Sequence, residues 1–206
     1  MTETELPRLY LVTPSAFELS RFSDRLAAVL DAFDVACLRL ALSSHDEDVL
    51  CRAAECCRAM TTPRDVALVI DRHVILADRL GLDGVHLSDG ARSVRSTRKT
   101  LGPDAIVGAY CGASRHDGMT AAESGADYVS FGPAGASVLG DGGRAEPDLF
   151  VWWSEMIETP VVAEGALDAP TLRSLANATD FFAIGDEIWQ HDDPVAALTA
   201  LTGALR

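Results

Sequence analysis

Positive charge is scarce in this chain of 206 residues, which has 17 lysines and arginines against 31 aspartates and glutamates. The formal net charge of −14 argues against a nucleic-acid or anionic-membrane partner, because both are themselves negatively charged. Long apolar runs are also lacking, and none approaches the roughly 20 residues of a membrane span. No positively charged N-terminal segment precedes an apolar run, so the sequence indicates no signal peptide.

Cysteine is present without a recognisable pattern. The five cysteines form no CxxC pair and no cysteine–histidine spacing of the kind that binds metals. Cys51, Cys56 and Cys57 fall on one expected helix, where filling the core is their more common role. We therefore expect reduced thiols in a cytoplasmic protein and predict no metal site from these residues.

Breaks between domains are lacking as well. No linker and no shift in composition divides the chain, which is long enough for one sizeable core and short for two. Its 48% hydrophobic and 23% charged residues are typical of an ordinary globular domain. We expect one domain spanning residues 1–206.

What the sequence does contain is an alternation of strand and helix patterns. The clearest stretch, residues 68–88, reads LVIDRHVILADRLGLDGVHLS. A β-branched apolar run ends at Asp71, apolar residues then recur at helical spacing up to Gly81, and a second strand follows. So short a connection favours parallel strands joined by a right-handed crossover.

The same alternation continues along the whole chain. Strands are expected at 8–13, 35–40, 66–70, 83–87, 105–109, 127–131, 160–163 and 181–184. Helices are expected at 17–30, 45–60, 74–80, 91–101 and 115–124, from 147, around 172–176 and from 194. Eight such units predict an α/β fold, a single (β/α)8 TIM barrel. A doubly wound open sheet is the main alternative, but no GxGxxG turn follows the first strand.

In such a barrel the working residues come from the carboxyl ends of the strands. The candidates there are Thr13, Arg39, Asp71, His86, Tyr110, Ser130, Glu164 and Asp186. Arg39 either binds a ligand or pairs with a carboxylate at a neighbouring strand end, since a buried arginine needs a partner. Asp71 could serve the site or cap the next helix, and a histidine such as His86 is more often a satisfied barrel residue than a catalyst. We take Arg39, Asp71 and His86 as the candidate catalytic residues.

Seven segments, in order along nearly the whole chain, resemble the thiamine-phosphate synthase family and its thiazole tautomerase (TenI-like) relatives. They are LYLVT, CLR, IDR, LGLDGVHL, GADYVSFGP, RAEPDLFVWWSE and PVVAEGAL, of which LGLDGVHL and GADYVSFGP are the most specific. The resemblance implies the TIM barrel. It also implies a magnesium-dependent reaction that joins an aminopyrimidine pyrophosphate to a thiazole phosphate through a pyrimidine cation.

Several positions to which the resemblance assigns a function carry other residues. The Gln-x-Arg-x-Lys of the second strand is reduced to Arg39, and the magnesium-binding Asn-Asp after the third strand is Asp71-Arg72. The second metal ligand after the fourth strand is missing or displaced to Asp89. Gly112 and Ala113 lie where the tautomerase histidine would be.

The glycine-rich segment 132–146, GPAGASVLGDGGRAE, is the one long irregular stretch, and we expect a mobile loop there. The family's Thr-x-Thr-Lys signature falls within it. Residues 136–140 read ASVLG instead, without either threonine or the lysine.

In such barrels phosphate sits on backbone N–H groups of the loops after the seventh and eighth strands, which form the expected phosphate cradle. The segments there are Glu164-Gly165-Ala166 and Gly185-Asp186-Glu187, and they bring up to three carboxylates to this cradle. Two like charges about 4 Å apart repel by roughly 4 kcal/mol at an effective dielectric of 20. These carboxylates therefore oppose phosphate unless they are protonated, paired or turned away. Arg72, Arg115 and Arg144 are the cations we consider as partners. The candidate substrate-binding residues are Ser130, Gly132, Glu164, Gly165, Gly185 and Asp186.

Three hypotheses follow. The one we favour is a diverged family member whose synthase reaction is lost or much reduced. Its barrel mouth would bind an uncharged or cationic small molecule, or it would serve a partner-binding or regulatory role. The second is a working synthase in which Asp71 and Asp89 bind magnesium and Arg39 binds pyrophosphate. The third is an isomerase of a thiazole precursor that uses His86, His116 and Glu164 in acid–base catalysis. A homodimer is compatible with all three.

Overall fold

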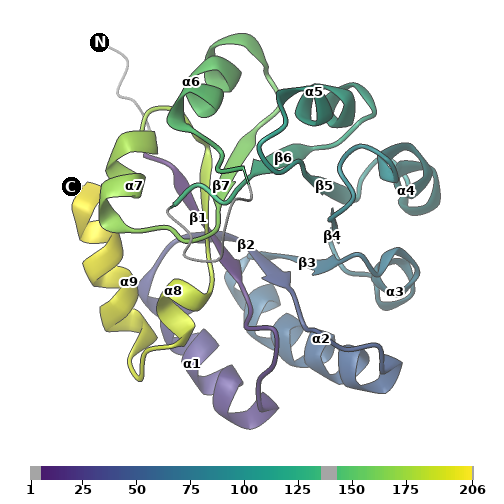
Figure 1. Ribbon diagram of the computed structural model, residues 1–206. Coiled ribbons are helices and arrows are strands. Elements are labelled where there is room, and N and C mark those ends of the chain that lie inside the picture. Colours follow the sequence, from purple (N-terminus) through teal and green to yellow (C-terminus); the bar gives the residue numbers. More distant parts are fainter. Residues whose placement is uncertain (1–5, 136–142, 206) are drawn as a thin grey trace.

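The computed structural model describes residues 6–135 and 143–205. Eight parallel strands pair in chain order, and β8 pairs with β1 to close the barrel. The helices form a ring around the sheet (Figure 1). Closure confirms the predicted (β/α)8 TIM barrel and excludes the open sheet. No helix of the described ranges is long and apolar enough to span a bilayer.

The strands lie within one residue of their predicted ends, because each is an apolar run bounded by polar residues or turns. They are β1 Arg8–Val12, β2 Val35–Leu40, β3 Ala67–Asp71, β4 Gly84–Leu87, β5 Ile106–Tyr110, β6 Tyr128–Phe131, β7 Val161–Glu164 and β8 Phe181–Ile184.

The helices follow the prediction with shifts where capping decides the start. They are α1 Leu19–Ala32, α2 Glu47–Thr61, α3 Val74–Leu80, α4 Val94–Leu101, α5 Arg115–Glu123, α6 Pro147–Met156, α7 Ala169–Leu175, α8 Asp186–Trp189 and α9 Pro194–Thr202. Two 3₁₀ turns, Thr62–Arg64 and Gly203–Leu205, extend α2 and α9. Glu18 accepts hydrogen bonds from the amides of Ser20 and Arg21, so α1 begins at Leu19 rather than at residue 17.

The start of α4 and the presence of α8 differ from the predicted helices. The segment 91–93 forms a turn, so α4 starts at Val94. The four-residue α8 was not predicted, because so short a helix shows no hydrophobic period. It follows β8 directly and lies beside α9 (Figure 1).

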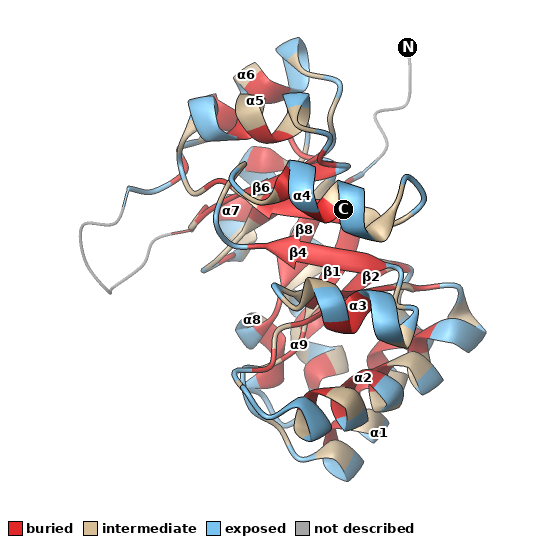
Figure 2. Cartoon of the chain, turned by 90° about the vertical axis from the view of Figure 1, so that its right-hand side faces the viewer, coloured by how far each residue is buried: buried red, intermediate tan, exposed pale blue. Residues whose placement is uncertain are grey.

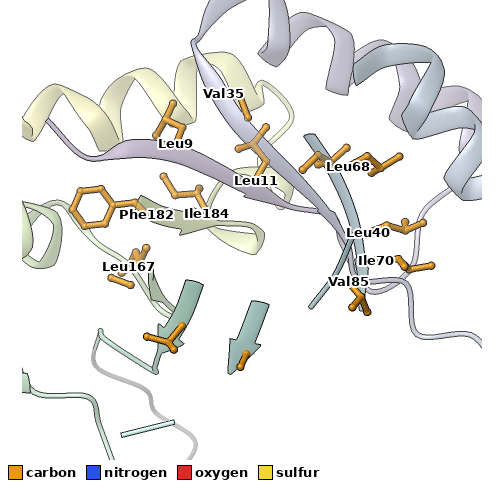
Figure 3. Close-up of a cluster of buried hydrophobic side chains, with 14 of the residues drawn as sticks. Leu9, Leu11, Val35, Leu40, Leu68, Ile70, Val85, Leu167, Phe182 and Ile184 are labelled. Atoms are coloured by element: carbon orange, nitrogen blue, oxygen red, sulfur yellow. The ribbon is translucent and has the colours of Figure 1, made fainter. Parts of the chain in front are cut away.

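The strands are buried on both faces, which gives the barrel two apolar layers. Figure 2 shows strands coloured almost wholly as buried and helices exposed on their outer faces. The outer layer, between sheet and helices, includes Leu11, Leu40, Leu68 and Ile184 (Figure 3). Alternate residues point into the barrel instead, as the two-residue period of a strand requires. These are Tyr10, Cys37, Val69, Tyr128, Val162 and Ala183.

Polar side chains are bonded to one another inside the barrel. The hydroxyls of Tyr10 and Tyr128 lie 2.7 Å apart, and the Tyr128 hydroxyl lies 2.9 Å from Nδ1 of His86. Gly108 on β5 makes room for this network, since a Cβ there would lie 2.0 Å from the Tyr128 ring. His86 is only 3% exposed. The structure therefore places it as the satisfied barrel histidine that the sequence left as an alternative, and its catalytic role stays a prediction.

Candidate functional site

A cavity of about 290 Å³ opens at the carboxyl end of the barrel, over β1, β2, β7 and β8. This cavity, the barrel mouth, contains several of the predicted residues. Its lining comprises Val12, Thr13, Ser15, Arg39, Ala41, Glu164, Gly165, Ala166, Ala183, Gly185, Asp186 and Glu187. The ends of strands that are far apart in the sequence thus meet in one place, as barrel topology requires.

Arg39 is the cation of this lining, and two carboxylates hold it. Its Nη1 donates a hydrogen bond of 2.8 Å to Oε2 of Glu164. Its Nε lies 3.4 Å from Oδ1 of Asp71, and its guanidinium lies 5.8 Å from the centre of the Tyr10 ring. The arginine is only 8% exposed. Burial of the charge therefore depends on these partners, and the ion-pair role considered for Arg39 is present.

The two carboxylates differ in how well they fit the arginine. Burial acts to lower the pKa of Arg39, but the carboxylates of Glu164 and Asp71 outweigh it and raise that pKa well above its usual value. Burial raises the pKa of Asp71, against the opposing effect of Arg39. Arg39 Nε and Asp71 Oδ1 face each other without a hydrogen bond to any described group. Glu164 is thus the strong partner of Arg39 and Asp71 the weak one.

Glu187 is one of the carboxylates expected at the phosphate cradle, although it was not among the candidate binding residues. Its Oε2 accepts a 2.8 Å hydrogen bond from the amide of Gly185, and its Oε1 accepts a 3.1 Å bond from the amide of Leu167. The neighbouring Asp186 is exposed. Of the carboxylates expected around the phosphate cradle, one is therefore paired with Arg39, one binds backbone amides and one faces solvent.

Ser130 and Gly132 lie outside the barrel-mouth lining. Ser130 is fully buried, and its hydroxyl has no hydrogen-bond partner in the part of the chain that the structure describes. The carbonyl of Gly132 accepts a 2.7 Å hydrogen bond from the hydroxyl of Tyr110. A Cβ at Gly132 would lie 2.4 Å from the carbonyl oxygen of Glu164, so only glycine lets the chain pass β7 so closely. Their predicted contact with substrate stays a prediction.

Within the described ranges, none of the arginines considered as partners forms an ion pair with the acids of the barrel mouth. The guanidinium of Arg115 lies 4.0 Å from the Trp152 ring centre, and Nε of Arg144 donates to the carbonyl of Ala134. Arg72 is exposed and makes no ion pair within the described ranges. The expected mobile loop contains residues 136–142, including ASVLG, which lie outside the described residues.

The described residues contain no preformed cluster for the magnesium ion that the resemblance implies. Nowhere in residues 6–135 and 143–205 do three histidine, cysteine, aspartate or glutamate side chains gather as a metal site. Asp71 faces Arg39, while Asp89 is exposed and accepts a 2.6 Å bond from the Ser93 hydroxyl. The carboxylate pair of the working-synthase hypothesis is therefore not assembled as a metal site.

Comparison with known proteins matches residues 9–188 to the family model described as thiamine monophosphate synthase. The chain belongs to this family. A thiamine-phosphate synthase of Rhodospirillum centenum is 41% identical, with 97% of this chain and 98% of the relative aligned. One of Erythrobacter litoralis is 37% identical over 95% of both chains.

The solved structure of the Pyrococcus furiosus thiamine phosphate pyrophosphorylase has a TM-score of 0.80, with 22% identity over 96% of this chain and 95% of that one. At that identity the likeness supports the fold alone. The resemblance to the thiamine monophosphate synthase family inferred from the sequence segments is thus confirmed.

Proposed function

We propose that this member of the thiamine monophosphate synthase family binds an uncharged or cationic small molecule in its barrel mouth. We also propose that it joins aminopyrimidine pyrophosphate to thiazole phosphate very slowly or not at all. The observation that carries both proposals is the pairing of Arg39 with Glu164, at 2.8 Å and with Asp71 beside them.

Pyrophosphate at Arg39 would compete with Glu164, which already accepts the hydrogen bond from Nη1. Separating the partners of a buried ion pair costs about 3–5 kcal/mol, because one charge is left without compensation. The displaced carboxylate would still lie near the incoming anion and repel it. A neutral or cationic ligand meets neither obstacle, because among the described lining residues Glu164, Asp186 and Glu187 outnumber Arg39.

The joining reaction also needs positive charge where the pyrophosphate leaves. Metal ions and arginine or lysine clusters supply that charge in phosphate-transfer sites. Here the guanidinium of Arg39 is already neutralised, and the described carboxylates do not gather in a preformed metal cluster. Both features reduce the positive charge available in the step in which pyrophosphate leaves, and we therefore expect a low rate.

The test is a direct assay with both family substrates and magnesium, followed by quantification of thiamine phosphate. We expect turnover far below about 1 per second, the lower end of ordinary enzyme rates. Turnover at ordinary rates would refute the proposal.

The second candidate function is that of a working synthase in thiamine biosynthesis. The relative named thiamine-phosphate synthase that is 41% identical over nearly the whole chain favours it. Asp71 and Asp89 would then bind magnesium and Arg39 pyrophosphate. In that case Asp71→Ala abolishes activity in the same assay while the circular dichroism spectrum is unchanged.

The isomerase hypothesis gains no support from the positions of its residues. His86 is buried in the barrel, His116 is exposed on α5, and Glu164 is paired with Arg39. A bell-shaped pH profile for thiazole isomerisation that survives EDTA would nevertheless establish it. The homodimer and the cytoplasmic location stay predictions.

A further inference from the structure

A second cavity lies outside the barrel mouth, between α2 and α3, which are neighbours in the outer ring (Figure 1). We call it the α2–α3 pocket. Its volume is about 360 Å³, and its described lining residues do not overlap with those of the barrel mouth. The segment before α2 contributes His45, and the turn between β3 and α3 contributes Arg72 and His73. The pocket is therefore separate from the site of the proposed function.

Positive side chains predominate in this lining. Arg72, Arg79, His45 and His73 line the pocket together with one carboxylate among the described residues, that of Glu47. Nη2 of Arg79 lies 2.6 Å from Oε1 of Glu47, so this acid is already paired. Arg72 is exposed and makes no ion pair with any described residue. In a chain of net charge −14, such a local excess of positive charge distinguishes this cavity as a place for an anion.

Three of these groups lie close enough for their charges to interact. Burial lowers the pKa of His73, and the positive charges of Arg72 and His45 lower it further. Like charges that converge on one cavity repel one another, and an anion bound between them relieves that repulsion.

The pocket also has an apolar wall, which consists of Leu50, Val74, Ile75 and Leu76. Ile75 is 70% exposed, although it is a large apolar side chain. Small-molecule sites typically combine such a wall with a few polar groups that fix the orientation of the ligand. The wall favours an apolar group on the ligand, and the cations favour an acidic one.

We propose that the α2–α3 pocket binds a small carboxylate that bears an apolar group, with the carboxylate at Arg72 and the apolar group against Ile75. The guanidinium suits this role because it presents paired N–H donors to a carboxylate. An imidazole keeps at least one N–H donor whether neutral or charged, so His45 and His73 can add hydrogen bonds to the same group. An anion without an apolar group leaves the wall uncovered and binds more weakly.

The backbone at Arg72 holds the guanidinium on a defined turn. Its φ of 61° lies in the left-handed region, and its amide donates a 2.9 Å hydrogen bond to the carbonyl of His86. Left-handed backbone is costly for a residue with a side chain, and such positions cluster at ligand sites. The exposed arginine therefore starts from a fixed point at the edge of the pocket.

The experiment titrates benzoate into the full-length protein at pH 7 and constant ionic strength, and follows the amide NMR shifts of His73 and Ile75. Benzyl alcohol has the same ring without the charge, and acetate has the charge without the ring. We expect benzoate to shift both amides saturably and to bind at least fivefold more tightly than either of the other compounds.

Two variants test the two parts of the pocket. Arg72→Asn removes the guanidinium with a residue that tolerates left-handed backbone, and we expect it to weaken benzoate binding at least fivefold. Ile75→Ser changes an exposed part of the wall and is expected to weaken binding at least threefold. Arg95→Asn is the matched control, because Arg95 is exposed on α4, outside the described lining, and its replacement removes the same charge. We expect that control to change the affinity by less than twofold.

The inference is overturned if benzoate shifts neither amide, or binds no more tightly than benzyl alcohol or acetate. An equal loss in Arg72→Asn and Arg95→Asn would also overturn it, because the net charge of the protein rather than the pocket would then decide. Unchanged affinity in Ile75→Ser would refute the contact with the wall.

The titration needs neither turnover nor a ligand in the barrel mouth. The proposed function fails by synthase turnover of the unmodified protein, which leaves this inference untouched, so the two failures are distinguishable.

Discussion

Nη1 of Arg39 on β2 lies 2.8 Å from Oε2 of Glu164 on β7, across the mouth of the barrel. The side chains of this pair are 10% and 16% exposed, so water screens it little. Asp71 on β3 approaches the same guanidinium at 3.4 Å. This arrangement stabilises the strand ends and at the same time takes the cation away from any anionic ligand.

The first prediction concerns the stability that this pair provides. Glu164→Ala leaves the buried guanidinium with Asp71 alone, and we expect the free energy of unfolding to fall by about 3 kcal/mol. Urea denaturation at pH 7 measures the change. The matched control is Glu47→Ala, because Glu47 pairs with Arg79 at 2.6 Å while their side chains are 65% and 50% exposed. Breaking that exposed pair should cost less than about 1 kcal/mol.

Equal effects of the two substitutions would contradict the prediction. A second check is the double variant Arg39→Ala/Glu164→Ala. Because it leaves no unpaired guanidinium, it should be less destabilised than the sum of its single variants.

The fold could be predicted because its signals are local. Each strand is an apolar run and each long helix has its own period, so eight units could be counted without knowing any long-range contact. The site could be predicted only in part. That Arg39 needs a carboxylate follows from burial, but Glu164 lies on a strand that does not neighbour β2, and only barrel closure brings the two together.

The contact from Glu187 was beyond sequence reasoning for a similar reason. It depends on the path of the loop after β7, which brings the Leu167 amide to the carboxylate. It also depends on α8, whose four residues give no pattern to recognise. Local sequence thus located the strand ends but not the hydrogen bonds made between them.

The second prediction concerns the pH dependence contributed by Asp71. Burial raises its pKa, so the folded state favours the protonated carboxyl. The stability that this group contributes is therefore present at low pH and is lost as pH rises from its unfolded pKa, about 3.9, through the raised folded value. Asp71→Asn mimics the protonated form. Relative to the unmodified protein, we expect the variant to gain stability as pH rises from 3.5 to 7 in urea titrations.

The exposed Asp89 provides the control at the next strand end. Asp89→Asn should follow the unmodified protein across the same pH range, within about 0.5 kcal/mol, as is usual for surface substitutions. A stability difference between Asp71→Asn and the unmodified protein that stays constant with pH would show that burial does not raise the pKa of this carboxyl.

The third prediction concerns His86. Burial and, to a lesser degree, Arg39 lower its pKa well below 6.5, so the folded protein holds it neutral. The unfolded chain binds a proton there below pH about 6.5, and stability is therefore lost as pH falls from 7 to 5, by up to about 1.4 kcal/mol per pH unit. His86→Asn, whose side-chain oxygen can still meet the Tyr128 hydroxyl, should reduce that slope. The exposed His116→Asn should leave it unchanged, and equal slopes in both variants would refute the assignment.

The fourth prediction concerns Gly108, which the barrel interior requires. A Cβ there would lie 2.0 Å from the Tyr128 ring, and hydrogen bonds between the Tyr128 hydroxyl and both Tyr10 and His86 hold that ring in place. Gly108→Ala must displace the ring or the strand, and we expect a loss of about 3 kcal/mol in the free energy of unfolding, the upper range for overpacking. Thermal and urea unfolding measure it.

Gly203 is the matched control, because nothing lies within 4 Å of a Cβ added there and its φ of −56° suits any residue. Gly203→Ala should be neutral or slightly stabilising. Replacing Tyr128 by leucine removes the clash together with the hydroxyl, so Gly108→Ala should cost much less in the Tyr128→Leu background than alone. If alanine at position 108 costs the same in both backgrounds, the Tyr128 ring is not what makes glycine necessary there.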